Sequence, residues 1–328
     1  MDNRALRWGL LSTARINRAL IPPLRASARN ELIAVASREL EAAKAYASEW
    51  SIPRAYGSYD DLLADPNIDV IYNPLPNALH AEWTIKAAQA GKHVLCEKPL
   101  ALSTDEVDAM DAAAKQAGVV VAEAFMYRHH PQTLKVKEMV DNGAIGTLRL
   151  VRGAFTFNLT RKADVRLDRT LGGGSIWDVG CYPISYARYV VGAEPMEVYG
   201  WQIAGPGGVD VTFVGQMRFA NGVCAQFDCG FRAPFRTHIE IVGSDGAISL
   251  PHPFRPGLGE RITVTRGDDV QTLAIPGEEL YVGEVEDRAD AILLGKPPRV
   301  SLADSRGNVA AIVALLRSAR ENRPLPVA

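Results

Sequence analysis

The first 125 residues alternate short apolar runs with amphipathic segments, and this alternation restricts the fold more than any other feature of the chain. Short apolar runs, each the length of a buried strand, cover Leu6–Leu11, Leu32–Ser37, Val70–Asn73, Val94–Glu97 and Val119–Phe125. Between them, residues 40–50 and 77–90 have helical spacing, and Ser103 with Glu106 forms a capping box that begins another helix. Repetition of strand and helix predicts a parallel, doubly wound sheet with right-handed crossovers.

After Phe125 the pattern changes to long alternating strands. The predicted strands are 148–159, 209–220, 223–231 and 237–242, and the predicted helices are 131–142, 176–191, 278–294 and 301–321. Asn221-Gly222 predicts a tight hairpin turn, and residues 243–246 predict another. We therefore expect an α/β protein: a Rossmann-type parallel sheet in residues 1–124, and in residues 125–328 an α+β domain with a large, mostly antiparallel open sheet.

Composition excludes several classes of function. Lys and Arg number 36 against 38 Asp and Glu, so no net field directs the chain to nucleic acid or to a membrane surface. No apolar stretch approaches the ~18 residues of a membrane span, and the N-terminus has no signal-peptide pattern. The four cysteines form no Cys-x-x-Cys pair, which predicts reduced thiols and a cytoplasmic location. His129-His130 has no further ligand at suitable spacing, so we expect no metal site.

The turn after the first apolar run stands where dinucleotide-binding folds carry Gly-x-Gly-x-x-Gly. In this chain Ser12, Ala14 and Asn17 occupy the glycine positions. The small side chains still let backbone N–H groups approach a pyrophosphate at the helix N-terminus, and the hydroxyls of Ser12 and Thr13 can donate to it. An ordinary connection between a strand and a helix is the alternative interpretation.

Two further strand ends indicate the cofactor and its cleft. The second run ends in Ser37-Arg38, where a carboxylate would bind the ribose hydroxyls of NAD. A cation with a neighbouring hydroxyl suits the 2′-phosphate of NADP instead. The alternative interpretation is that Arg38 is an ordinary solvated surface residue. The third run, Val70–Asn73, continues through two prolines in residues 74–77, a rigid passage that can form a wall of the cofactor cleft before His80 enters the next helix.

Two clusters carry residues suited to proton transfer. Glu97-Lys98-Pro99 places an acid and a base at the carboxyl end of a central strand, where open α/β sheets bind ligands. The alternative interpretation is an ordinary surface ion pair after a strand. Gly172–Gly174 open a helix, and a start near residue 175 would put Asp178 and Tyr182 on one face, four residues apart. Lysine and tyrosine together can transfer a proton to or from a hydroxyl during hydride transfer; the alternative is that Tyr182 only packs on the sheet.

Taken together, these residues resemble the Gfo/Idh/MocA family, named for glucose-fructose oxidoreductase, inositol dehydrogenase and a rhizopine-catabolism protein. The matching segments are Ser12–Ile16, Asn73–His80, Glu97–Pro99, Glu123–Pro131 and Gly172–Pro183. The resemblance implies NAD(P)-dependent oxidation of a sugar, polyol or diol, with Lys98 as the family's essential lysine, Glu97 beside the nicotinamide ribose and Asp178 as the site aspartate. Many members carry histidine at the position of Tyr182. With a tyrosine at this position, the chain resembles the branch of the family that contains dihydrodiol dehydrogenase, glucose-fructose oxidoreductase and NADP-dependent xylose dehydrogenase.

We therefore expect an NADP-dependent aldose 1-dehydrogenase, of the D-xylose type. A keto-sugar or anhydro-sugar reductase using NADPH, a trans-dihydrodiol dehydrogenase, and a non-catalytic NADP-binding sensor are the alternatives. The expected catalytic residues are Lys98, Tyr182 and Asp178. The expected cofactor contacts are Ser12, Thr13, Ala14, Arg15, Ile16, Ser37, Arg38, Leu75, Pro76, Asn77, His80, Glu97, Lys98 and Arg128. The expected substrate contacts are Lys98, Arg128, Phe157, Asp178 and Tyr182. The exposed face of the antiparallel sheet predicts a homodimer or homotetramer.

Overall fold

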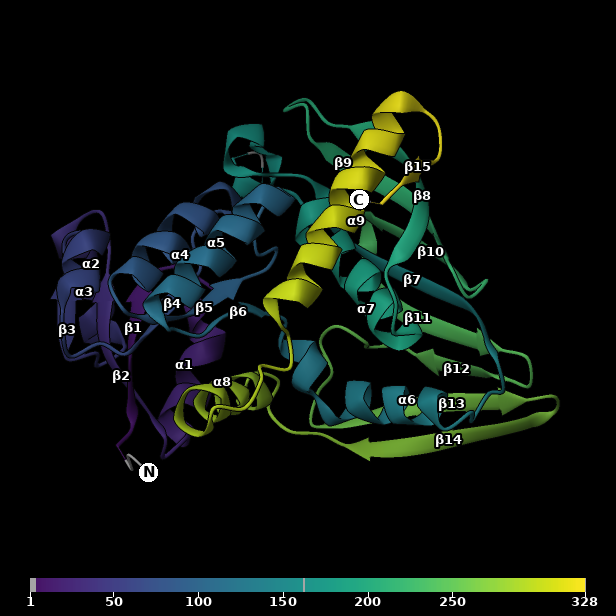
Figure 1. Ribbon diagram of the computed structural model, residues 1–328, viewed down its shortest axis with the longest axis horizontal. Helices are drawn as coiled ribbons and strands as arrows, with labels where there is room; N and C mark the ends of the chain where they lie inside the picture. Colours follow the sequence, from purple (N-terminus) through teal and green to yellow (C-terminus); the bar gives the residue numbers. More distant parts are fainter. Residues whose placement is uncertain (1–3, 162, 328) are drawn as a thin grey trace. The chain divides into compact units, whose positions relative to one another are not determined.

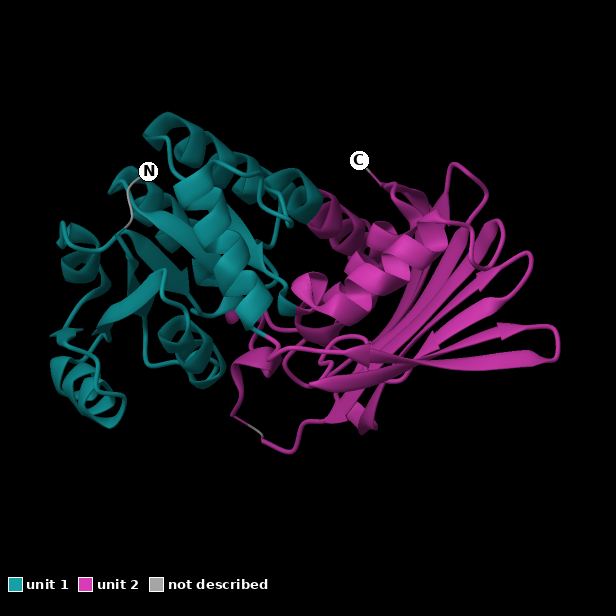
Figure 2. Cartoon of the chain, turned by 90° about the horizontal axis from the view of Figure 1, so that it is seen from below, with its two compact units in different colours: residues 1–126, 281–306 teal, residues 127–280, 307–328 magenta. Residues whose placement is uncertain are grey.

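The computed structural model describes residues 4–161 and 163–327, which form two compact units (Figure 2). The first unit consists of residues 1–126 and 281–306, and the second of residues 127–280 and 307–328. The sequence pattern predicts a second domain that runs without interruption from 125 to 328. Residues 281–306 instead return to the first unit, because α8 (Val282–Leu294) packs on α1 (Asn17–Ala26) and its carboxylates bond to Arg29.

The first unit is built on a six-stranded parallel sheet (Figure 1). Its strands are β1 (Leu6–Leu11), β2 (Asn30–Ala36), β3 (Arg54–Tyr56), β4 (Val70–Asn73), β5 (His93–Glu97) and β6 (Val121–Ala124). The order β3-β2-β1-β4-β5-β6 reverses direction between β1 and β4, which is the Rossmann arrangement and confirms the predicted fold of this half. Strand interiors such as Trp8 and Tyr72 are fully buried, as expected for a sheet covered on both faces.

Helices connect these strands. They are α1, α2 (Leu40–Glu49), α3 (Tyr59–Ala64), α4 (His80–Gln89) and α5 (Thr104–Ala117). Ser103 caps α5 as predicted, since its hydroxyl accepts from the Glu106 N–H at 3.2 Å, while the Glu106 carboxylate accepts from the Leu102 N–H at 2.8 Å in place of the Ser103 N–H of a capping box. The helix expected over 77–90 is divided into a 3₁₀ turn, η1 (Asn77–Leu79), and α4, because the chain must first leave the extended passage through Pro76.

The second unit is built on a nine-stranded sheet with the order β14-β13-β12-β11-β7-β10-β9-β8-β15. Its strands are β7 (Leu148–Asn158), β8 (Pro195–Ala204), β9 (Asp210–Phe219), β10 (Cys224–Gly230), β11 (Arg232–Gly243), β12 (Ala247–Leu250), β13 (Gly259–Arg266), β14 (Asp269–Pro276) and β15 (Leu325–Pro326). β7 and β10 pair in parallel and the other neighbours antiparallel, which confirms the mostly antiparallel sheet. The predicted hairpin at Asn221-Gly222 joins β9 to β10.

One face of this sheet is covered by helices. Gly153, Phe227 and Gly215 are neighbours across three strands and therefore point to the same face. A Cβ added at Gly153 would meet Pro183 of α7 (Cys181–Val191), and one at Gly215 would approach Leu315 of α9 (Leu302–Glu321). A third helix, α6 (Pro131–Asp141), packs against β14. The opposite face of the central strands has no helix packed on it among the described residues (Figure 1).

Candidate active site

The predicted cofactor residues of the first unit lie at one edge of its sheet. Residues 12–16 follow β1, Ser37 and Arg38 follow β2, residues 75–77 follow β4, and Glu97-Lys98 close β5. Because these strands are parallel neighbours, their carboxyl ends meet along one rim. Ligands of open α/β sheets bind at that rim, beside the point where the strand order reverses.

The turn between β1 and α1 has a backbone conformation typical of glycine, although no glycine lies in it. Ser12 has φ of 106°, a region that L-residues rarely adopt and that costs about 1–3 kcal/mol. Two bonds hold the turn: the Ser12 N–H donates to the Ala36 carbonyl at 3.1 Å, and the buried Asn17 amide donates to the Ser12 carbonyl at 2.9 Å. Asn17, at the third glycine position, therefore ties the turn to the helix. A strained backbone held in this way is typical of ligand sites.

The end of β2 presents a hydroxyl and a cation. The Ser37 N–H donates to the Tyr56 carbonyl at 3.0 Å, which fixes the chain as it leaves the sheet. Arg38 follows on the surface and, within residues 4–161 and 163–327, forms no ion pair. The contact of Ser37 and Arg38 with a cofactor stays a prediction.

His80 holds the passage after β4 to the loop after β5. Its ring nitrogens lie 2.8 Å from the Pro99 carbonyl and 2.7 Å from the Leu75 carbonyl, and the side chain is 1% exposed. Burial lowers the pKa of His80 to about 4; the two carbonyls oppose this shift and the charge of Lys98 adds to it. Through these two contacts His80 joins the passage after β4 to the loop after β5 and so positions the rim. Its direct contact with a cofactor stays a prediction.

Glu97 is oriented by a residue that the sequence analysis did not identify. The Tyr72 hydroxyl donates to Glu97 Oε1 at 2.6 Å, and the Lys98 backbone N–H donates to Oε2 at 3.2 Å. Burial and the nearby Glu97 raise the pKa of Tyr72, so the phenol stays protonated and keeps donating. A tyrosine inside a buried strand needs a hydrogen-bond partner for its hydroxyl. The position of Tyr72 within a predicted strand was therefore the signal in the sequence that could have pointed to this contact.

In the second unit, the glycine-rich segment opens a π-helical turn. The sequence predicts one α-helix that starts near residue 175, but Ile176–Gly180 form a π-helix (η5) that continues into α7. The buried Asp210 carboxylate accepts from the Ser175 hydroxyl at 2.5 Å and from the Ile176 N–H at 2.8 Å, which fixes the start of the turn. Asp178 lies inside this π-turn, and such turns are frequent at functional sites.

Tyr182 lies in a cluster of aromatic rings. Its ring centroid is 5.8 Å from that of Tyr127, 5.3 Å from Phe155 and 5.5 Å from Phe254, and the residue is 5% exposed. Tilted contacts at these distances stabilise a ring in one orientation. Tyr127 and Phe254 were not anticipated, because they come from segments far apart in the sequence.

Two predicted substrate contacts also pack within this unit. The Arg128 guanidinium lies 4.0 Å from the Tyr189 ring centroid and donates to the Ser185 hydroxyl at 3.3 Å. Phe157, half-buried on β7, packs on Phe231 with centroids 5.2 Å apart. Both side chains therefore have a packing role, and their contact with substrate stays a prediction.

Asp178 is bonded to a cation that the sequence analysis missed. The Nε of Arg166 donates to Asp178 Oδ2 at 2.6 Å. Arg166 comes from the short 3₁₀ turn η3 (Val165–Leu167), in a loop with no pattern that singled it out. Neither residue type nor spacing in the sequence reveals that the two side chains meet.

Two family models match the chain. Residues 6–125 match the oxidoreductase family with an NAD-binding Rossmann fold, and residues 133–249 match the GFO/IDH/MocA C-terminal domain. The chain belongs to the Gfo/Idh/MocA oxidoreductase family. This confirms the family resemblance and the assignment as an oxidoreductase. Within residues 4–161 and 163–327, this oxidoreductase has no group of three His, Cys, Asp or Glu placed to hold a metal and no helix able to cross a membrane.

Several characterised relatives are similar over nearly the whole chain. The D-xylose 1-dehydrogenase (NADP(+)) 2 of Haloferax volcanii is 39% identical over 96% of this chain and 97% of its own length. A 3-ketoreductase from Actinomadura kijaniata, solved in complex with NADP and TDP-benzene, superposes with a TM-score of 0.92 and 30% identity, covering 96% of this oxidoreductase and 98% of that chain. An aldose-aldose oxidoreductase from Caulobacter crescentus, solved with glycerol, has a TM-score of 0.91 and 28% identity over 98% and 100% of the two chains.

Proposed function

We propose that this enzyme transfers a hydride between a sugar hydroxyl and the nicotinamide of NADP, as an aldose 1-dehydrogenase of the D-xylose type. The proposal is carried by two observations in a chain of this family: a lysine, Lys98, directly after a strand of the first unit, and a buried tyrosine, Tyr182, in the second unit. The relative of the same length named D-xylose 1-dehydrogenase (NADP(+)) supports the substrate class and the cofactor.

The residues at the rim of the first unit fit a phosphorylated dinucleotide. The glycine-like backbone at Ser12 and the start of α1 suit a pyrophosphate, and the cation of Arg38 beside the Ser37 hydroxyl suits a 2′-phosphate. We propose that the turn residues Thr13, Ala14, Arg15 and Ile16, the passage Leu75–Asn77, and Glu97 line the same site. NADP, when bound, supplies the acceptor or donor of the hydride.

The chain's own residues handle the proton and the substrate. We propose that Tyr182 takes the proton of the reacting hydroxyl as general base, and that the ammonium of Lys98 stabilises the negative charge on the phenolic oxygen. Asp178 binds a substrate hydroxyl, and Arg128 and Phe157 are the further proposed contacts. The aromatic rings around Tyr182 exclude water and keep the phenol in one orientation.

An assay of NADP reduction against aldoses, polyols, inositols and trans-dihydrodiols tests this function. We expect turnover with an aldopentose or aldohexose, with NADP giving the higher kcat/KM than NAD. If the enzyme turns over only a trans-dihydrodiol, the proposed sugar substrate is wrong and the enzyme is a trans-dihydrodiol dehydrogenase. Tight NADP binding without turnover in either direction would support a non-catalytic NADP-binding sensor.

A second candidate is reduction of a keto-sugar with NADPH. The 3-ketoreductase of Actinomadura kijaniata superposes on nearly the whole chain, and the same proton-transfer residues serve both directions of the reaction. Oxidation of NADPH by a keto-sugar or anhydro-sugar, without NADP reduction by aldoses, would favour this candidate over the dehydrogenase.

Arg38 is expected to select NADP over NAD. Arg38→Ala removes charge-assisted bonds to the 2′-phosphate worth about 1.5–3 kcal/mol, so the KM for NADP should rise roughly 10- to 100-fold while that for NAD changes little. Steady-state kinetics with both cofactors measures the ratio. Arg18→Ala, an exposed arginine of α1 paired with Glu49, is the control. Equal effects on the two cofactors would refute the phosphate contact.

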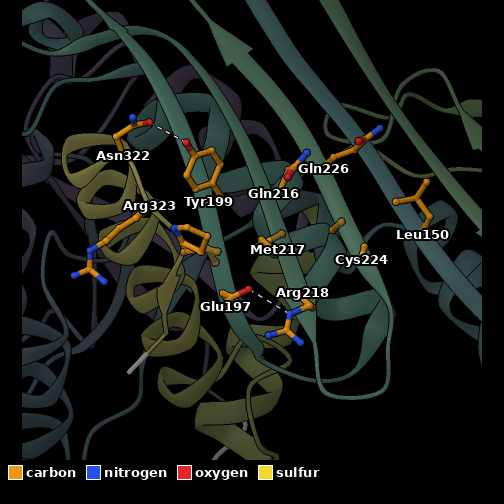
Figure 3. Close-up of a pocket in the computed structure, with 13 residues that line it drawn as sticks. Leu150, Glu197, Tyr199, Gln216, Met217, Arg218, Cys224, Gln226, Asn322 and Arg323 are labelled. Carbon is orange, nitrogen blue, oxygen red and sulfur yellow. Dashed lines mark hydrogen bonds and ion pairs between the residues drawn. The ribbon is translucent and has the colours of Figure 1, made fainter.

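We also propose that two copies associate through the uncovered face of the second unit's sheet. Trp201 of β8 pairs across to Val214 of β9, and these side chains are 49% and 41% exposed. Figure 3 shows the neighbouring part of the same face, where Tyr199 and Gln216 line a pocket and the Tyr199 hydroxyl donates to Asn322 at 2.8 Å. An apolar surface on adjacent strands is best covered by a second copy of itself.

Trp201→Glu is therefore expected to convert the oligomer to monomers, because it places like charges in the centre of an apolar interface. Size-exclusion chromatography with light scattering measures the mass. Leu40→Glu, on an exposed position of α2 in the first unit, is the matched control and should leave the mass unchanged. A wild-type monomer, or a variant of unchanged mass, would contradict the proposed interface.

The thiols bear on where the enzyme works. Cys96, Cys181, Cys224 and Cys229 are all free, and three of them are buried. We propose that the enzyme acts in the cytoplasm, where a reducing environment keeps such thiols unmodified.

A further inference from the structure

Arg166 bonds to two almost fully buried carboxylates. Its Nε donates to Asp178 Oδ2 at 2.6 Å and its Nη1 donates to Asp164 Oδ1 at 3.3 Å. The side chains of Asp178 and Asp164 are 14% and 7% exposed. Removing a carboxylate from water without a cation is costly, so this guanidinium compensates the burial of both.

The glycine-rich segment is shaped to hold the loop that carries Arg166. The Gly174 N–H donates to the Arg166 carbonyl at 2.9 Å, and the Gly173 N–H donates to the Asp168 carbonyl at 2.9 Å. A Cβ at Gly173 would lie 2.6 Å from the Arg166 carbonyl oxygen, closer than such contacts allow. A side chain at this position would therefore move the loop and its arginine. Gly173 therefore allows the loop that carries Arg166 to pack closely against the start of η5.

We propose that Arg166 is a positioning residue that keeps Asp178 ionised and oriented as a hydrogen-bond acceptor for a substrate hydroxyl. Asp178 then does not exchange a proton during the reaction, which leaves proton transfer to Tyr182 and Lys98. This inference rests on the proposed function, because it assigns a role within the same site. It replaces the expectation that Asp178 is itself a proton-transfer residue.

The charges around Asp178 agree with this role. Burial disfavours the charge of Arg166, but Asp178 and Asp164 outweigh burial and raise the pKa of Arg166. Several titratable groups lie on elements packed against η5: Asp210 on β9, Cys229 and Asp228 on β10, and Cys181 and Tyr182 on α7. Burial raises the pKa of Asp210 and of Cys229, and Asp228 is paired with Arg236 at 2.6 Å. From β7, Phe155 contributes an uncharged ring. Arg166 supplies a positive charge bonded directly to the Asp178 carboxylate.

Titration of Asp178 by carbon NMR tests the proposal without any substrate. Protein labelled at the aspartate carboxyl carbon is titrated as wild type, Arg166→Met and Arg166→Lys, and the signal lost in Asp178→Asn assigns Asp178. Removing the cation raises the pKa of the carboxyl, so we expect the Asp178 midpoint to rise by about one unit or more in Arg166→Met. Arg166→Lys keeps a charge and should give a smaller rise. Arg169→Met, an exposed arginine in the same loop, should titrate as wild type.

Kinetics supplies a second readout with the same variants. In Arg166→Met, kcat/KM should fall about 10²-fold and the acidic limb of its pH profile should move to higher pH, with NADP affinity unchanged. Partial recovery of kcat/KM in Arg166→Lys, which keeps the positive charge, would show that Arg166 acts by positioning Asp178 and not only by supporting the fold. An Asp178 midpoint that is the same in wild type and Arg166→Met overturns the proposal. If wild type oxidises or reduces no sugar, the proposed function fails, and the NMR titration still decides the role of Arg166.

Discussion

Replacing Lys98 by methionine is expected to lower kcat by roughly 10³-fold or more, because the substitution removes the ammonium that we propose stabilises the phenolate of the general base. Methionine retains most of the length and apolar character of the lysine stem. The rim around it is held by other contacts, namely the Tyr72–Glu97 hydrogen bond and the His80 contacts to the carbonyls of Leu75 and Pro99. The fold and the binding of NADP should therefore survive the substitution.

Single-turnover and steady-state kinetics measure the loss, and fluorescence titration measures the Kd for NADPH. Lys115→Met, on the exposed surface of α5, is the matched control and should keep the wild-type rate. A fully active Lys98→Met enzyme would remove the lysine from the mechanism. Loss of NADP binding in parallel with activity would instead assign Lys98 to the cofactor.

Tyr182→Phe is expected to lower kcat by about 10²- to 10⁴-fold with little change in KM, because it removes only the phenolic oxygen that we propose takes the proton. The phenyl ring keeps the contacts of the original ring with Tyr127, Phe155 and Phe254. The melting temperature should therefore stay close to that of wild type, which separates a chemical role from a packing role.

Tyr186→Phe is the matched control for this experiment. Tyr186 lies four residues further along α7, is fully buried, and stacks on Tyr127 with ring centroids 5.7 Å apart. Removal of its hydroxyl should leave kcat unchanged. If Tyr182→Phe is as active as Tyr186→Phe, then Tyr182 serves packing alone and another group carries the proton.

Much of the first unit could be predicted because its signals are local. The runs at Leu6–Leu11 and Val70–Asn73 coincide with β1 and β4, and Ser103 caps α5 as its spacing with Glu106 indicates. Strand ends, caps and turns depend on a few consecutive residues, so they are visible in the sequence. The same holds for the hairpin at Asn221-Gly222.

The second sheet was harder to predict, since several of its strands lack a strong pattern. β14 is exposed at most positions, and β12 has only four residues, so neither shows a clear alternation of apolar and polar side chains. Such strands form because neighbouring strands offer hydrogen-bonding edges, and this information lies in the tertiary structure. The return of residues 281–306 to the first unit depends likewise on packing between segments distant in the chain.

The sequence by itself predicted five of the six strands of the first unit in their order, missing β3 and the helix α3 that follows it, and it indicated Lys98, Asp178 and Tyr182 and membership of an oxidoreductase family. Only the tertiary structure decided which side chains meet: Tyr72 with Glu97, and Arg166 with Asp178. The physical reason is that backbone conformation follows from near neighbours. Partners of buried charged and polar groups are instead selected by the whole fold, which must satisfy each of them once water is excluded.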